Sequence, residues 1–135
     1  MFSISKQADY ALQFLLELSI LPDGEWLSVR VFANERTISF LFLQKIVRKL
    51  KQSGYVKATK GVNGGYRLAV EAGDISLKHI IEAVEGPYTS AACLKGEHCP
   101  IEDKCTSKPV FSFVQRDIIQ SLEKYTLQQM VQMSM

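Results

Sequence analysis

The sequence of 135 residues lacks any apolar run of the roughly 18 residues that a membrane-spanning helix requires. Its start, Met-Phe-Ser-Ile-Ser-Lys, also lacks the basic stretch and following apolar stretch of a signal peptide. It contains no internal repeat and no low-complexity tract. No segment supplies a pocket motif, or a base with a residue to orient it, for catalysis. We therefore expect a cytoplasmic protein that has no membrane partner and is not an enzyme.

Cysteine is scarce and confined to one segment, with Cys93, Cys99 and Cys105 separated by five residues each. An odd number of cysteines cannot pair completely within one chain, and a reducing compartment disfavours disulfides. Thiolates gathered in a short polar segment are suited to a soft metal centre. The regular spacing favours a metal or redox role over three incidental thiols.

Acidic residues are scarce over residues 26–67, which hold nine basic side chains and one acidic side chain. The flanking segments are acidic overall, with one basic and four acidic residues in 1–25 and six basic and nine acidic in 68–135. A basic block in a chain of net charge +2 is typical of a phosphate-binding face. A solvated lysine-rich surface, or a surface for a membrane or an acidic protein, is the alternative.

Apolar residues recur at intervals of three and four over three successive segments, which predicts helices at about 4–21, 28–35 and 39–52. Ser28 and Ser39 are the expected N-caps of the second and third helices. Extended runs at 55–59 and 66–70 follow, and the Asn-Gly pair between them is a strong hairpin-turn signal. Three helices followed by a hairpin is the order of a winged helix-turn-helix, which we place at 1–73.

Residues 74–135 are predicted to form a second part of the chain. It comprises a fourth helix of about ten residues, a cysteine loop at about 88–108, and a long helix that Pro109 opens. Thr126 and Gln129 fit a capping box for a final short helix. The long helix is apolar on two sides, so we predict that it pairs with a second copy of the chain. The alternative is packing on its own domain only. The expected fold is thus mainly α with a small β-hairpin.

The third predicted helix is expected to enter the major groove of DNA, where the second helix of such a unit presents its N-terminal residues to base edges. Gln44 can bond adenine, Lys45 can bond guanine or a phosphate, and Phe40 or Leu41 can meet thymine methyl groups. The Gly-rich hairpin tip can approach a phosphate or the minor groove, with Lys60 supplying charge. The candidate DNA-binding residues are Ser39, Phe40, Phe42, Gln44, Lys45, Arg48, Lys60, Gly61, Asn63, Gly64, Gly65 and Tyr66.

Residues 38–46, 50–56 and 60–69, the last with its Gly-Gly-Tyr, resemble the small bacterial winged-helix regulators that include IscR, NsrR and RirA. Residues 9–12 and the cysteine triplet add to this resemblance, which covers essentially the whole chain. It implies a homodimeric transcription factor, expected to be a repressor, on a palindromic operator in double-stranded DNA. It further implies a long dimerisation helix and an iron–sulfur cluster bound in the cysteine loop.

The resemblance also implies the cluster ligands, which are Cys93, Cys99, Cys105 and a fourth group, because such centres usually take four protein ligands. IscR-like members use a histidine three residues after the last cysteine, where this chain has Lys108, which cannot bind iron while protonated. NsrR-like members use an aspartate of the first helix of the partner subunit, and Asp9 matches it here. A 4Fe-4S cluster is therefore favoured over a 2Fe-2S cluster, and the expected signal is nitric oxide, iron or redox status.

Two other roles for the thiols stay open. A structural zinc site favours thiolate pairs two to four residues apart, whereas the gaps here are five residues. A redox switch that uses the thiols without a metal is the other alternative.

Overall fold

The computed structural model describes residues 3–62, 64–87, 100–101 and 104–134. Two strands, β1 (Val56–Thr59) and β2 (Gly65–Leu68), form an antiparallel hairpin in which Val56 pairs with Leu68. A 3-10 turn, η1 (Ala72–Asp74), follows the hairpin. The helices are α1 (Lys6–Ser19), α2 (Val29–Arg36), α3 (Phe40–Gln52), α4 (Leu77–Glu85), α5 (Lys108–Lys124) and α6 (Leu127–Ser134). The mainly helical architecture with a small hairpin confirms the predicted fold class.

Helices α1, α2, α3, α4 and α6 each begin after a serine or threonine whose side chain caps a free backbone N–H group of the first turn. Each capping serine accepts a hydrogen bond at Oγ from the backbone N–H three residues later, and these serines are Ser5, Ser28, Ser39 and Ser76. Before α6, the Thr126 N–H donates to Gln129 Oε1 at 3.1 Å, and the Gln129 N–H donates to Thr126 Oγ1 at 3.2 Å. The predicted capping box is thereby confirmed.

One apolar core runs through the helical body and joins residues from both predicted parts of the chain. Within this core, helix α1 packs against α3, α4 and α6. Helix α3 contributes four side chains with no exposed surface, Leu43, Ile46, Val47 and Leu50. Burying a side chain of this size contributes about 1.5–3 kcal/mol. This stripe therefore fixes how α3 is rotated about its own axis.

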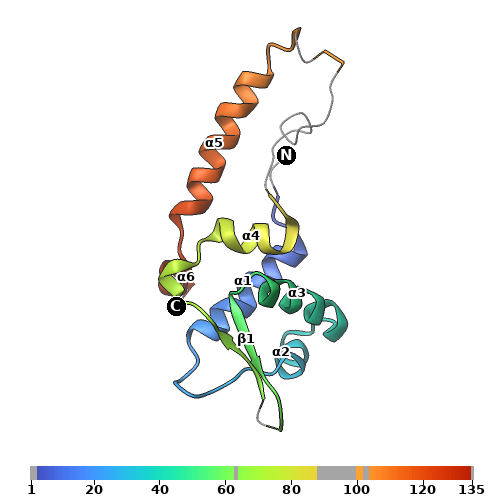
Figure 1. The fold of residues 1–135 in the computed structure, drawn as a ribbon, viewed down its shortest axis with the longest axis vertical. Coiled ribbons are helices and arrows are strands. Elements are labelled where there is room, and N and C mark those ends of the chain that lie inside the picture. The colour runs from blue at the N-terminus through green and yellow to red at the C-terminus, as the bar shows by residue number, and fades with distance from the viewer. Residues whose placement is uncertain (1–2, 63, 88–99, 102–103, 135) are drawn as a thin grey trace.

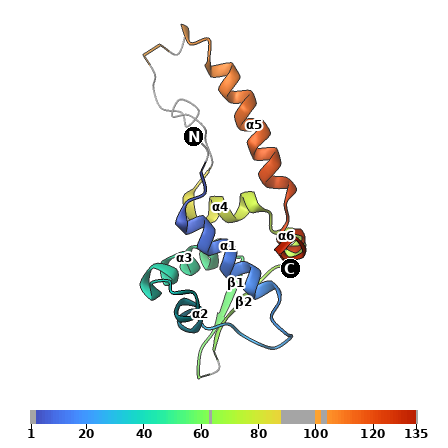
Figure 2. The same cartoon turned by 180° about the vertical axis from the view of Figure 1, so that it is seen from behind.

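The hairpin and helix α5 project from opposite ends of the helical body (Figures 1 and 2). Helix α5 joins the apolar core through its C-terminal half, where Leu122 is buried and Ile118 is half-buried. Its N-terminal half carries four exposed apolar side chains, Val110, Phe111, Phe113 and Val114. Among the residues that the structure describes, no helix is both long and apolar enough to cross a lipid bilayer.

The hairpin, called the wing below (56–68), is tied to the segment before α2 by the backbone. Leu27 and Tyr66 exchange two N–H to carbonyl hydrogen bonds of 2.8 Å each. Gly65, the residue before Tyr66, has a φ of +157°. A Cβ at this position would lie 2.4 Å from the Leu27 carbonyl oxygen. Only glycine therefore fits at this contact.

We predict that Gly65→Ala lowers the free energy of unfolding by about 1–3 kcal/mol, because the added methyl group must displace the Leu27 backbone. Urea denaturation followed by circular dichroism measures the change. Val62→Ala is the control, since the Val62 side chain is wholly exposed on the same wing, and its effect should stay within about 0.5 kcal/mol. Equal stability of the Gly65→Ala variant and the wild type would contradict the prediction.

Candidate nucleic-acid interface and cysteine site

Helix α3 exposes one continuous stripe on the side opposite its buried residues. The stripe consists of Leu41, Gln44, Lys45 and Arg48, all exposed and spaced at helical intervals of three and four. We call these four residues the recognition stripe. The sequence predicts Gln44, Lys45 and Arg48 as DNA-binding residues and names Leu41, with Phe40, as a possible contact of thymine methyl groups. The spacing of Leu41, three residues before Gln44, is the signal that places it on this face.

The other predicted residues at the start of α3 are held by contacts within the domain. Ser39 is exposed, and its hydroxyl caps the helix. Phe40 is half-buried, with the Arg30 guanidinium 4.1 Å from its ring centroid. Phe42 is half-buried and packs edge-on against Tyr10, with ring centroids 5.9 Å apart. Contact of these three residues with DNA stays a prediction.

Most of the positive charge in the basic block is not compensated by carboxylates. Of the nine basic residues in 26–67, only Arg36 forms an ion pair within the described part of the chain, to Glu17 at 2.8 Å. Five lysine and arginine side chains on α3 and the wing are exposed, Lys45, Arg48, Lys51, Lys57 and Lys60. Uncompensated positive charge on these neighbouring elements attracts phosphate groups.

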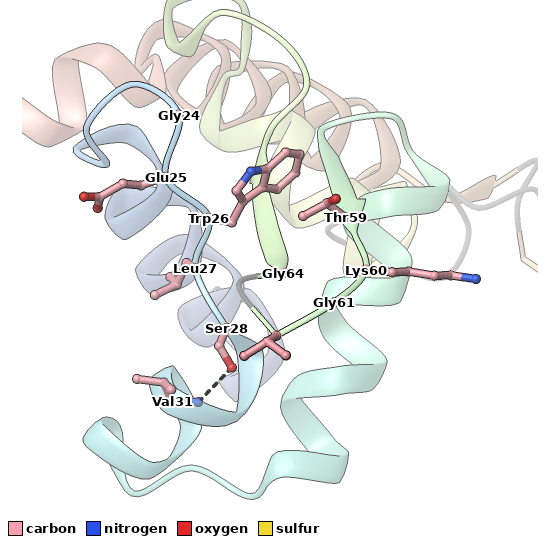
Figure 3. Close-up of a pocket in the computed structure, with 11 residues that line it drawn as sticks. Gly24, Glu25, Trp26, Leu27, Ser28, Val31, Thr59, Lys60, Gly61 and Gly64 are labelled. Carbon is pink, nitrogen blue, oxygen red and sulfur yellow. Dashed lines mark hydrogen bonds between the residues drawn. The ribbon is translucent and has the colours of Figure 1, made fainter.

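The wing stands apart from α2 across an open groove of about 810 Å³, shown in Figure 3. The groove lies between residues 24–31 and the wing, and the Lys60 side chain extends away from it (Figure 3). Among the predicted wing residues, Lys60 and Gly61 are exposed, whereas Gly64, Gly65 and Tyr66 are half-buried. Asn63 lies outside the described residues. The exposed end of the wing thus presents one cation beside glycine backbone.

One lysine of the basic block points inward and connects three helices. The Lys49 amine of α3 donates to Gln7 Oε1 of α1 at 2.9 Å and to the Val84 carbonyl of α4 at 3.0 Å. A cation is favourable at this carbonyl because the C-terminal end of a helix is the negative end of its dipole. The Ser5 hydroxyl also donates to the Glu85 carboxylate at the same end of α4. The end of α4 is therefore fixed to both α1 and α3.

Of the three cysteines, only Cys105 lies within the described residues, and it is half-buried before α5. Its Sγ lies 3.2 Å from Ser107 Oγ. This hydrogen bond, together with backbone N–H groups of Ser107 and Lys108 and the positive charge of Lys108, lowers the pKa of the Cys105 thiol. A lowered pKa favours the thiolate, which is the form that binds metals. Cys105 therefore suits a soft metal centre.

The remaining predicted ligand, Asp9, is exposed in the first turn of α1 and accepts a hydrogen bond from Gln13 Nε2 at 3.1 Å. This carboxylate is available to a group outside its own domain. Cys93 and Cys99 lie outside the described residues. Within the described ranges alone, no three histidine, cysteine, aspartate or glutamate side chains converge.

A pH experiment tests the environment of Cys105. In a Cys93→Ser/Cys99→Ser variant, we predict that alkylation by iodoacetamide reaches its half-maximal rate at a lower pH than for free cysteine. Ser107→Ala removes the largest contribution to the lowered pKa and should shift this midpoint upward. Thr106→Ala is the matched control, because it removes an exposed hydroxyl one residue away. A midpoint that Ser107→Ala leaves unchanged would contradict the assignment.

Taken together, a three-helix unit, a two-stranded wing and an appended long helix define a winged helix-turn-helix protein. The chain belongs to the Rrf2 family, described as iron-dependent transcriptional regulators, whose family model matches residues 4–133. This confirms the family that the sequence resembles, which is a family of transcription regulators.

The chain is also similar to solved structures of CymR and IscR. CymR (YrzC), the global cysteine regulator of B. subtilis, has a TM-score of 0.81 and 25% identity, and the match covers 98% of both chains. T. potens IscR has a TM-score of 0.79 and 25% identity, with 99% of this chain and 89% of that chain covered. An oxidised form of S. aureus CymR is 26% identical with a TM-score of 0.74, and 96% of each chain is covered.

Proposed function

We propose that this protein represses transcription by placing α3 in the major groove of operator DNA, with an affinity set by an iron–sulfur cluster. The observation that carries the proposal is the recognition stripe, which is exposed and carries positive charge that no carboxylate of the described residues neutralises. Gln44 would read adenine, and Lys45 would contact guanine or phosphate. Lys60 and the glycine backbone of the wing would contact the DNA backbone.

Two copies of the chain would bind a palindromic operator, since a two-fold symmetric dimer presents two recognition helices to half-sites about 34 Å apart. The exposed apolar side chains of α5, such as Phe111 and Phe113, support pairing through this helix. In this division of roles, residues 1–73 read DNA, while residues 74–135 carry the cysteine segment and the pairing helix.

The cluster would be held by Cys93, Cys99 and Cys105, with Asp9 of the partner subunit as the fourth ligand. Membership in a family described as iron-dependent supports this assignment, and so does the lowered pKa of Cys105. When bound, such a cluster supplies an iron centre that responds to nitric oxide, oxygen or iron supply. A 4Fe-4S centre is favoured, because Lys108 occupies the place of a histidine ligand. A carboxylate is a harder and weaker ligand for iron than a thiolate.

Lys49 provides a path from the cysteine segment to the DNA-reading helix. The Val84 carbonyl that it binds lies at the end of α4, from which the chain continues towards Cys93. A shift of this helix end would move the Lys49 amine and, with it, α3. Coupling between two sites of a protein typically amounts to about 1–3 kcal/mol.

The test begins with an operator selected from genomic DNA fragments by anaerobically isolated protein. We predict that removing the iron and sulfide changes operator affinity by about 5- to 150-fold. In Lys49→Met, the ratio of operator affinities with and without the cluster should be close to one, because the hydrogen bond from Lys49 to the Val84 carbonyl is lost. Lys51→Met, a change of the same kind at an exposed position of α3, is the control and should preserve the ratio.

Three outcomes would contradict different parts of this proposal. Failure to select any sequence over non-specific DNA would remove the DNA-reading function. Equal affinity of the protein with and without its cluster would remove cluster sensing. An unchanged ratio in Lys49→Met would remove only the path through α4.

A metal-free thiol switch is the second candidate. It is favoured by the lowered pKa of Cys105 and by the similarity to S. aureus CymR, which was solved in an oxidised form. Colourless anaerobic protein with no iron, no acid-labile sulfide and thiols that react with iodoacetamide would support this candidate. Zinc in place of iron would instead indicate a structural metal site.

A further inference from the structure

An apolar side chain is exposed in the first turn of α3. Leu41 is 67% exposed. A single exposed leucine is common on protein surfaces and indicates nothing alone. Here, however, Phe40 before it contacts Arg30, and Phe42 after it packs on Tyr10. Of these three apolar residues, Leu41 is the one that faces outward.

The surroundings of Leu41 fit DNA better than an apolar protein surface. One turn further along α3, the recognition stripe continues with Gln44 and Lys45, which are polar and positively charged. A protein partner that buried Leu41 would also desolvate this lysine. In a major groove, by contrast, the lysine meets phosphate or base acceptors while the leucine meets the edge of a base.

Leucine has no hydrogen-bonding group, so it cannot read the donors and acceptors of a base pair. The one apolar group that the major groove presents is the C5-methyl group of thymine. Residues in the first turn of a recognition helix are those that contact base edges. Leu41, the second residue of α3, occupies such a position.

We propose that Leu41 makes the operator prefer thymine at one position of each half-site through contact with the thymine methyl group. This inference rests on the proposed function, because it requires α3 to lie in the major groove. It goes beyond that function by assigning to Leu41 the thymine contact that the sequence leaves open between Phe40 and Leu41, because Phe40 is held under Arg30 while Leu41 is exposed.

The experiment removes the methyl group from the DNA rather than from the protein. In the selected operator, each thymine is replaced in turn by uracil, and affinity is measured for the wild type and for Leu41→Ala. At one thymine per half-site, the wild type should lose about four-fold in affinity, which corresponds to about 0.8 kcal/mol for one methyl-sized group. Leu41→Ala should bind the thymine and uracil operators equally.

Two further variants serve as controls. Ile20→Ala removes another exposed apolar side chain, at the end of α1 and outside the recognition stripe, and should respond to uracil as the wild type does. Leu41→Met keeps an apolar side chain of similar reach and should retain part of the response. Thermal unfolding of all variants separates a loss of contact from a loss of fold.

The outcomes distinguish this inference from the function on which it rests. If no operator can be selected, the proposed function fails. If an operator is selected but uracil weakens Leu41→Ala and the wild type by the same factor at every thymine, the assignment of Leu41 is overturned while the function stands.

Discussion

The burial of one side of α3 is the constraint on which the rest of the structure depends. Leu43, Ile46, Val47 and Leu50 are excluded from solvent, and rotating the helix to expose them would forfeit several kcal/mol of apolar burial. Because an α-helix repeats every 3.6 residues, the opposite side must face outward. The polar and basic residues of the recognition stripe are therefore presented as a consequence of core packing.

Contacts at both ends of α3 then restrict its movement relative to the domain. At the N-terminal end, Phe40 lies under Arg30 and Phe42 packs on Tyr10. Towards the C-terminal end, the Lys49 amine joins α3 to α1 and to the last turn of α4. If α4 is displaced, as the proposed function requires, these contacts would carry α3 with it.

Local features of the fold were predictable from the sequence, and contacts across the fold were not. Periodicity and capping chemistry predicted three helices close to their observed bounds, the wing, and the Thr126–Gln129 capping box, because these depend on residues near one another in the chain. The bond from Lys49 to Val84 spans 35 residues, and no local pattern indicates it. For the same reason the sequence could not predict that Phe40 would contact Arg30 or that Phe42 would pack on Tyr10. Nor does spacing alone predict that Ser107 lowers the pKa of Cys105.

The most direct measurement of the central claim is a methyl and amide NMR titration of the protein with its selected operator duplex. The account predicts that the largest chemical-shift changes occur at Leu41, Gln44, Lys45 and Arg48, with smaller changes at the buried stripe of α3. Large changes confined to α5, with the recognition stripe unaffected, would contradict it.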